Sequence, residues 1–446
     1  MQTFHAITIL ATFSILILSC SGGSRKGASV GTFDDFSSLP KPSLIPFREG
    51  RWDKEKLVKK NYFGLAKADD PNSIVVTPQF SEILYAPEEG VYLAALEDEK
   101  PSEDKFKYTI HIYDKKGKEQ TVLRSETSPI VWGHDEFRDG LVTYSRDGKD
   151  GAMDLLGKDV IVPQYDDLVL MGEGLAAAEL GGKWTLISIG GGKAKELFAP
   201  KYSEIDFIIS EGLIRVQEDK REGFINTKGE VVIPPQYEEV SSFSEGLAAV
   251  KIGNKYGYIN KENKEVIRAQ YDFADLFVNG FARVQRDGRW GYINKKGEEV
   301  VSPRYKEAGN FINGVAPVRL EDDWGCINEK GELFIPPQYK LIWRFPSINV
   351  IAVKKDNRWG FLDFKGNELV SPRYEDFNGF GENGLAVVKI GEKWGYVDKK
   401  GRVVISPKYD RAYPFMPCVE LAVVYEDGKI NYIDENGKPL LKEGLS

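Results

Sequence analysis

The segment Lys393-Trp394-Gly395-Tyr396-Val397-Asp398 decides the fold, because nearly the same six residues recur along the chain. Residues 255–260 read Lys-Tyr-Gly-Tyr-Ile-Asn, and residues 289–294 read Arg-Trp-Gly-Tyr-Ile-Asn. Each segment is followed by a turn, a Val/Ile stretch and a closing tyrosine. The closing tyrosines lie 34 to 37 residues apart, at positions 165, 202, 237, 271, 305, 339, 374 and 409. A period this constant predicts tandem copies of one supersecondary unit that stack on their neighbours.

The copy that ends at Tyr409 predicts a β-meander. Its apolar stretches Leu385–Ile390, Trp394–Asp398 and Arg402–Ser406 are separated by short turns that contain glycine. The segment Tyr409–Phe415 leads to the next copy and is a candidate for a short fourth strand. The body shows no sustained helical periodicity. We therefore expect an all-β protein of antiparallel hairpin or meander repeats of roughly 35 residues.

Most copies place a glycine in the middle of the second strand. A glycine weakens a strand unless another backbone must come close there or the strand bulges. We therefore expect such a contact or bulge at each glycine. We also expect the preceding aromatic residue to be mostly buried between adjacent copies. These predicted structural positions are Trp184, Gly223, Tyr256, Gly257, Trp290, Gly291, Trp324, Gly325, Trp359, Gly360, Trp394 and Gly395.

The repeated phrase resembles the WG repeat family of bacterial proteins, also called KWG repeats. The resemblance covers residues 140–441 and fades over residues 47–139, where we expect divergent β repeats with an insert. Some copies are altered: Thr185 stands where the glycine belongs, and Ile430-Asn431 replaces the Trp-Gly pair. Altered copies suit the ends of an array, where a unit has a neighbour on one side only. The resemblance implies the architecture and says little about function.

The number of copies bears on how the array is arranged. About nine or ten copies exceed the roughly 4 to 8 blades usual in a β-propeller. Units of about 35 residues are also shorter than a four-stranded WD40 blade. We therefore expect an open, twisted β array, with a closed propeller-like ring as the alternative.

The first residues resemble a targeting signal. Ala6–Leu18 is mostly apolar and too short to span a bilayer as a helix. Ile17-Leu18-Ser19-Cys20 resembles a bacterial lipobox, which implies a signal peptide over 1–19, a lipid on Cys20 and an envelope location. Residues 20–46 are rich in Ser, Gly and Pro, so we expect a flexible tether there. An ordinary cleaved signal and a retained anchor are alternatives, because no Lys or Arg precedes the apolar run. Residues 442–446 form a C-terminal tail.

Composition and motifs exclude several classes of chemistry. The net charge of −8 argues against a nucleic-acid partner. Beyond the predicted signal peptide the only histidines are His111 and His134, and no metal-binding spacing or phosphate loop is present. The acidic stretch Asp147–Asp154 lacks the spacing of a calcium loop and fits a solvated hairpin. Cys326 and Cys418 are expected to be buried thiols. We expect no cofactor and no metal.

These observations lead to two functional hypotheses. The first is a non-catalytic envelope lipoprotein whose β-repeat surface binds or scaffolds a protein or a glycan. The second is a glycan-acting enzyme that uses carboxylates on one face of the array, which the 68 acidic residues leave open. A repeat array keeps its structural positions constant and varies its binding positions, so the ligand surface should lie where the copies differ.

Overall fold

The computed structural model describes residues 44–53, 58–67, 74–80, 82–86, 91–97, 108–125, 137–381, 383–415 and 421–439. These residues form antiparallel β-sheets and no α-helix, which confirms the all-β prediction. None of their helical segments is long and apolar enough to span a membrane. Cys20, the predicted signal peptide, His134, Cys418 and the C-terminal tail lie outside the described residues.

The described strands form eleven small sheets, each built from strands that are consecutive in the chain. The sheets nearest the N-terminus consist of β1 (Leu44–Asp53), β2 (Val58–Lys67) and β3 (Ile74–Phe80); β4 (Glu82–Ala86), β5 (Val91–Glu97), β6 (Tyr108–Asp114) and β7 (Glu119–Ser125); and β8 (Phe137–Arg138), β9 (Leu141–Arg146), β10 (Lys149–Asp154) and β11 (Asp159–Tyr165). β1 begins at Leu44, inside the predicted tether of residues 20–46, because Leu44 and Ile45 pair with Lys67 and Ala66.

The next sheets consist of β12 (Asp167–Gly172), β13 (Leu175–Leu180), β14 (Lys183–Gly190) and β15 (Lys193–Glu196); β16 (Glu204–Ile205), β17 (Leu213–Glu218), β18 (Arg221–Asn226) and β19 (Val231–Tyr237); β20 (Leu247–Ile252), β21 (Lys255–Asn260) and β22 (Glu265–Tyr271); and β23 (Phe273–Ala274), β24 (Phe281–Arg286), β25 (Arg289–Asn294) and β26 (Glu299–Tyr305).

The remaining sheets consist of β27 (Glu307–Ala308), β28 (Val315–Leu320), β29 (Asp323–Asn328) and β30 (Leu333–Tyr339); β31 (Leu341–Phe345), β32 (Val350–Lys355), β33 (Arg358–Asp363) and β34 (Glu368–Tyr374); β35 (Asp376–Phe380), β36 (Ala386–Ile390), β37 (Lys393–Val397) and β38 (Val403–Tyr409); and β39 (Arg411–Ala412), β40 (Ala422–Glu426) and β41 (Lys429–Ile433). A 3-10 turn, η3 (Pro346–Ile348), connects β31 to β32.

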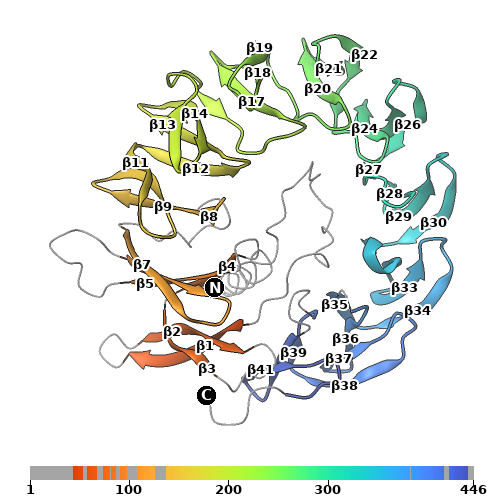
Figure 1. Ribbon diagram of the computed structural model, residues 1–446. Coiled ribbons are helices and arrows are strands. Elements are labelled where there is room, and N and C mark those ends of the chain that lie inside the picture. The colour runs from red at the N-terminus through yellow and green to blue at the C-terminus, as the bar shows by residue number, and fades with distance from the viewer. Residues whose placement is uncertain are drawn as a thin grey trace.

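One copy of the repeat is an antiparallel meander whose strands we call a, b, c and d, as in the order β23-β24-β25-β26. The predicted short fourth strand is strand a of the following sheet. In most copies strand d ends at the closing tyrosine, and strand a of the next sheet begins two residues later. In Figure 1 the sheets follow one another around a broad curve, with the short a strands β27 and β35 inside and the d strands β30 and β38 outside.

The tandem antiparallel repeats that the sequence predicts are therefore confirmed. Each described sheet contains only consecutive strands, so no sheet combines strands from the two ends of the array. The curve in Figure 1 resembles the ring of the alternative prediction. Within the described residues, however, no interstrand hydrogen bonding closes it.

The glycine of strand c lies against the backbone of strand d, as the sequence predicts. A Cβ added to Gly291 would lie 2.6 Å from the nitrogen of Pro303 and closer still to the carbonyl oxygen of Val301. The same clash with strand d occurs at Gly223, Gly257, Gly325, Gly360 and Gly395. The register between β25 and β26 shifts on both sides of Tyr292, so strand d bulges over the glycine.

The residue of strand d that faces the glycine is proline in most copies, and proline has no N–H that would need a partner. The exception is Ala269, which faces Gly257. Its free N–H donates to Glu265 Oε1 at 2.9 Å. The polar group that proline would have removed is therefore satisfied by a side chain.

The copy without the glycine shows what the contact does. Thr185 is fully buried at that position, and β15 pairs with β14 without a register shift. The chain then makes a detour before Tyr202 bridges back to Trp184. This copy closes at Tyr202, 37 residues after Tyr165, which is the longest spacing in the array. A side chain at the glycine position thus displaces strand d and lengthens the repeat.

The hydrophobic cores lie between neighbouring sheets. One cluster joins Tyr258 and Ile267 of the β20–β22 sheet to Phe277 and Val284 of the following copy. The next joins Tyr292 and Val301 to residues of the β27–β30 sheet, including Phe311. Each copy therefore buries both faces against its neighbours, as expected for a linear stack.

The second aromatic of the repeated phrase is more deeply buried than the first. Tyr258, Tyr292 and Tyr396 are fully buried, and each hydroxyl donates to a backbone carbonyl of the following copy. Trp359 is buried too, at 2% exposure, beneath Trp343. The other aromatics of the motif, Trp184, Tyr256, Trp290, Trp324 and Trp394, are only half-buried. The predicted burial is therefore nearly complete at Trp359 and partial in the other copies, where each ring keeps some exposed surface. Trp359 differs because the ring of Trp343 lies against it.

Replacing Gly291 by alanine tests the glycine contact. Because the new Cβ would meet the backbone of β26, strand d must shift, and we expect a loss of about 1 to 3 kcal/mol or more in the free energy of unfolding. Urea denaturation followed by circular dichroism measures this loss. Gly190→Ala is the matched control, since nothing lies within 4 Å of the added Cβ and its φ is not positive. Equal stability of the two variants would contradict the account.

Replacing Trp359 by alanine should cost about 3 to 5 kcal/mol, as for a large core aromatic. Trp290→Ala should cost clearly less, because water already reaches part of its ring. The same denaturation experiment compares the two variants. If both variants lost the same free energy of unfolding, the difference in burial between Trp359 and Trp290 would not determine their contributions to stability.

Candidate functional site

The position two residues after each closing tyrosine is acidic in five copies and differs in the other three. This position lies in or next to strand a, on the inner side of the curve in Figure 1, and is exposed in every described copy. We call these eight residues the inner rim: Asp167, Glu204, Glu239, Phe273, Glu307, Leu341, Asp376 and Arg411. The backbone position is the same in each copy, but the side chain is acidic, basic or apolar. The inner rim is therefore a surface on which the copies differ, as expected for the binding positions of a repeat protein.

Six of the eight rim residues have a polar neighbour on strand b and the motif aromatic beyond it on strand c. The exceptions are Glu204, which is followed by Gln217 and Glu222, and Arg411, which is followed by Tyr425 and Ile430. Phe273 pairs with Gln285, and Gln285 pairs with Trp290 in the ladder. In two copies the strand b residue neutralises the rim acid, because Lys251 contacts Glu239 at 2.5 Å and Arg319 contacts Glu307. The charge of the rim is thus partly balanced within the array.

The rim carries an aromatic patch, which we define as Tyr256, Phe273 and Trp290. The Phe273 ring lies 5.7 Å from the Tyr256 ring and 5.6 Å from the Trp290 ring, between centroids. Phe273 is 41% exposed. The Arg283 guanidinium lies 5.4 Å from the centroid of the Trp290 ring. Burial, together with a hydrogen bond to Glu239, raises the pKa of Tyr256 to about 12, so this hydroxyl stays protonated at neutral pH.

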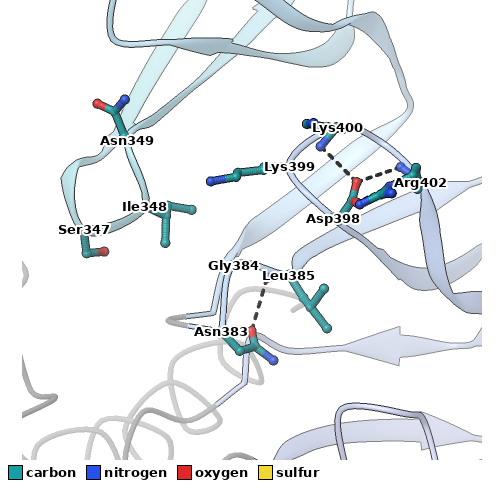
Figure 2. A pocket seen from close by; sticks show the side chains of 10 residues that line it. All are labelled: Ser347, Ile348, Asn349, Asn383, Gly384, Leu385, Asp398, Lys399, Lys400 and Arg402. Carbon is teal, nitrogen blue, oxygen red and sulfur yellow. Dashed lines mark hydrogen bonds and ion pairs between the residues drawn. The ribbon is translucent and has the colours of Figure 1, made fainter.

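A second surface lies at the other end of the strands, where the a–b and c–d turns meet. Turns alternate between the two ends of an antiparallel meander, so this surface is opposite the rim. A cleft of about 580 Å³ opens there between the β31–β34 and β35–β38 sheets (Figure 2). It is lined by Ser347, Ile348, Asn349, Asn383, Gly384, Leu385, Asp398, Lys399, Lys400 and Arg402.

Within the cleft the carboxylate of Asp398 is used by its own turn. It accepts hydrogen bonds from the backbone N–H groups of Lys400 and Arg402, and it pairs with Arg402 Nε at 2.5 Å. Burial opposes the charged form, but these hydrogen bonds outweigh it and lower the pKa of Asp398. Lys399 extends from the turn towards Ile348 and Asn349 (Figure 2). The described lining residues therefore leave an excess of positive charge in the cleft.

This cleft was not predictable from the sequence, because Lys399 and Asn349 on its two sides are 50 residues apart. The one available signal was spacing. The copies that close at Tyr374 and Tyr409 are each 35 residues long, one more than the three copies before them. The altered a–b turns of these copies, η3 with Asn349 and the turn at Asn383, form one wall.

The other positions that the sequence analysis considered for chemistry lie in a turn, on a strand or in the core. Asp147 and Gly148 form the turn of the β9–β10 hairpin, as expected for the acidic stretch. The described residues contain no group of three potential metal ligands. His111 Nδ1 lies 2.7 Å from Glu119 Oε2. Cys326 is fully buried, and burial raises the pKa of its thiol to about 12.

Comparison with known proteins places the repeats in a family. The model of the WG containing repeat matches residues 151–184, 192–221, 223–256, 256–290, 290–322, 324–359, 359–394 and 394–429. A search of curated proteins finds no match.

Solved structures that resemble the chain share little sequence with it. A eukaryotic initiation factor is 10% identical with a TM-score of 0.39, covering 67% of this chain and 94% of its own. Apo AztD from Citrobacter koseri is 11% identical with a TM-score of 0.27, covering 68% and 91%. The β-propeller domain of the Trilobed protease from Pyrococcus furiosus is 10% identical with a TM-score of 0.26, covering 64% and 90%. The eight matched repeats span more than half of the sequence, and the chain therefore belongs to the family of WG containing repeat proteins.

Proposed function

We propose that the protein is a non-catalytic binding or scaffolding protein of the bacterial cell envelope, and that its inner rim contacts a protein or a glycan. One observation carries the proposal. The exposed rim position changes its chemistry from copy to copy, while the glycine and the buried tyrosine behind it recur. In a repeat protein the binding residues are displayed in this way on a constant scaffold.

The aromatic patch is the part of the rim best suited to contact a ligand. Exposed aromatic rings supply large contact areas with little loss of conformational entropy, and Tyr, Trp and Arg dominate binding hot spots. Phe273 connects the rings of two successive copies, and Arg283 and Gln285 supply polar groups beside them. Sugars and peptides both bind such surfaces through apolar faces with polar edges.

A glycan-acting enzyme is the second candidate, and one acid favours it. Asp150 stands where other copies have the motif aromatic. Burial raises the pKa of its carboxyl, and the nearby charge of Asp167 raises it further, against a hydrogen bond from Ser145 at 2.5 Å. A carboxyl with a raised pKa near a second carboxylate is the kind of pair that glycoside hydrolysis uses.

Phe273→Ser and Leu341→Ser test the rim, with Val404→Ser as the matched control. Leu341 and Val404 are 39% and 45% exposed, but Val404 lies on the outer strand β38. Binding is measured on a glycan array and by cross-linking to envelope proteins in cells. We expect the rim variants to bind at least about tenfold more weakly than the wild type, as for a hot-spot residue, and the control variant to bind as the wild type does. Equal binding by all three variants would contradict the proposal that the inner rim contacts the ligand. Sugar release that stops in Asp150→Asn would support the enzyme instead.

The envelope location rests on the sequence of the first 20 residues. Cys20→Ala removes the thiol that would carry the lipid, so the protein should move from the detergent phase to the aqueous phase on phase partitioning. Cys326→Ala is a suitable control, because this thiol is buried in the array. If Cys20→Ala stayed in the detergent phase, the lipid anchor would be wrong, whatever the rim binds.

A further inference from the structure

Adjacent copies are joined by glutamate–lysine pairs on the side of the array opposite the rim. In the a–b turn of the β16–β19 sheet, Glu211 accepts a hydrogen bond from the N–H of Gly246 in the next copy. Lys261, in the c–d turn of that next copy, lies 3.0 Å from the carboxylate of Glu211. The next pair of copies repeats the arrangement with Glu245, Gly280 and Lys295. Each glutamate thus neutralises the lysine of the copy that follows it.

The cleft contains the same lysine without the glutamate. Lys399 is the first residue after the Asp or Asn of the c–d turn, which is the position of Lys261 and Lys295. In place of the two-residue turns that contain Glu211 and Glu245, the preceding copy has the four-residue loop Pro346–Asn349, which contains no carboxylate. Asn349 is left-handed with φ 58°, as Glu211 and Glu245 are at 52° and 55°. No carboxylate in the described part of the chain forms an ion pair with Lys399.

We propose that this cleft binds a small hydroxyl-rich anion, such as a uronic acid, whose carboxylate takes the place of the missing glutamate beside Lys399. Lys400 adds a second exposed cation, since the charge of Asp398 is already satisfied by Arg402. Ser347, Asn349 and Asn383 offer hydroxyl and amide groups, and Ile348 and Leu385 offer apolar surface.

The size of the cleft fits this ligand class, because small-molecule sites are typically about 300 to 1,000 Å³. A carboxylate and a phosphate share the chemistry that recognises them, so free phosphate is a second source of the anion. The site goes beyond the proposed function, since it lies at the opposite end of the strands from the rim. If no anion binds in the cleft, the proposal for the inner rim is unaffected.

Asn349→Glu is the decisive variant, because it places a carboxylate in the loop beside Lys399. The φ of 58° at this residue is one that Glu211 and Glu245 adopt in their own turns. Lys399→Gln removes the cation itself, and Lys295→Gln is the matched control at a lysine that Glu245 already pairs. Circular dichroism and thermal melting confirm that each variant folds. Isothermal titration of the full chain with glucuronate, with glucose as the neutral match, and with inorganic phosphate then measures binding.

We expect glucuronate to bind more tightly than glucose and to weaken with added salt, because the interaction is ionic. Asn349→Glu and Lys399→Gln should each weaken it at least about tenfold, while Lys295→Gln binds as wild type. Preference for glucuronate over phosphate identifies a sugar acid, and equal competition by phosphate identifies a general anion site; both support the proposal. No salt-dependent binding of either anion, or unchanged binding by Asn349→Glu and Lys399→Gln, would overturn it.

Discussion

The close approach between the strand c glycine and the strand d backbone organises the whole array. At Gly291 the backbone of strand d takes the space of a missing Cβ, and it bulges there on both sides of Tyr292. The bulge carries strand d to the closing tyrosine, and strand a of the next sheet begins two residues later. The contact therefore also determines where each copy begins. Thr185 shows the consequence of a side chain at that position, since strand d is displaced and the repeat becomes longer.

This constraint separates structure from function. Because the glycine and the buried tyrosine fix the backbone, the residues at the ends of the strands are free to differ. The inner rim uses this freedom on one side, where the side chain changes between copies. The turns use it on the other side, where the two-residue turns of Glu211 and Glu245 give way to the longer loop Pro346–Asn349 beside the cleft. The two proposed binding surfaces are thus variations on one scaffold, and a change in one should leave the other intact.

Much of the fold followed from the sequence, because period and glycine placement are local signals. The stacking of copies, the close contact at Gly291 and the buried Cys326 were all predictable. The exposure of Trp290 was not, since it depends on how far water reaches the end of the sheet. The cleft was not predictable either. Lys399 and Asn349 are 50 residues apart, and their proximity depends on which turns of successive sheets meet.

Hydrogen exchange measured by mass spectrometry tests most directly the claim that the copies with the motif glycine are all built around the glycine contact. Slow exchange reports the most stable hydrogen bonds of a fold. Strands β25, β29 and β33 should be the most protected segments and protected alike, with the a–b turns exchanging fast in each copy. Protection should decrease towards β41, whose copy lacks the motif. If β25, β29 and β33 exchanged as fast as the turns, or differed widely from one another, the glycine contact would not be the common basis of the fold.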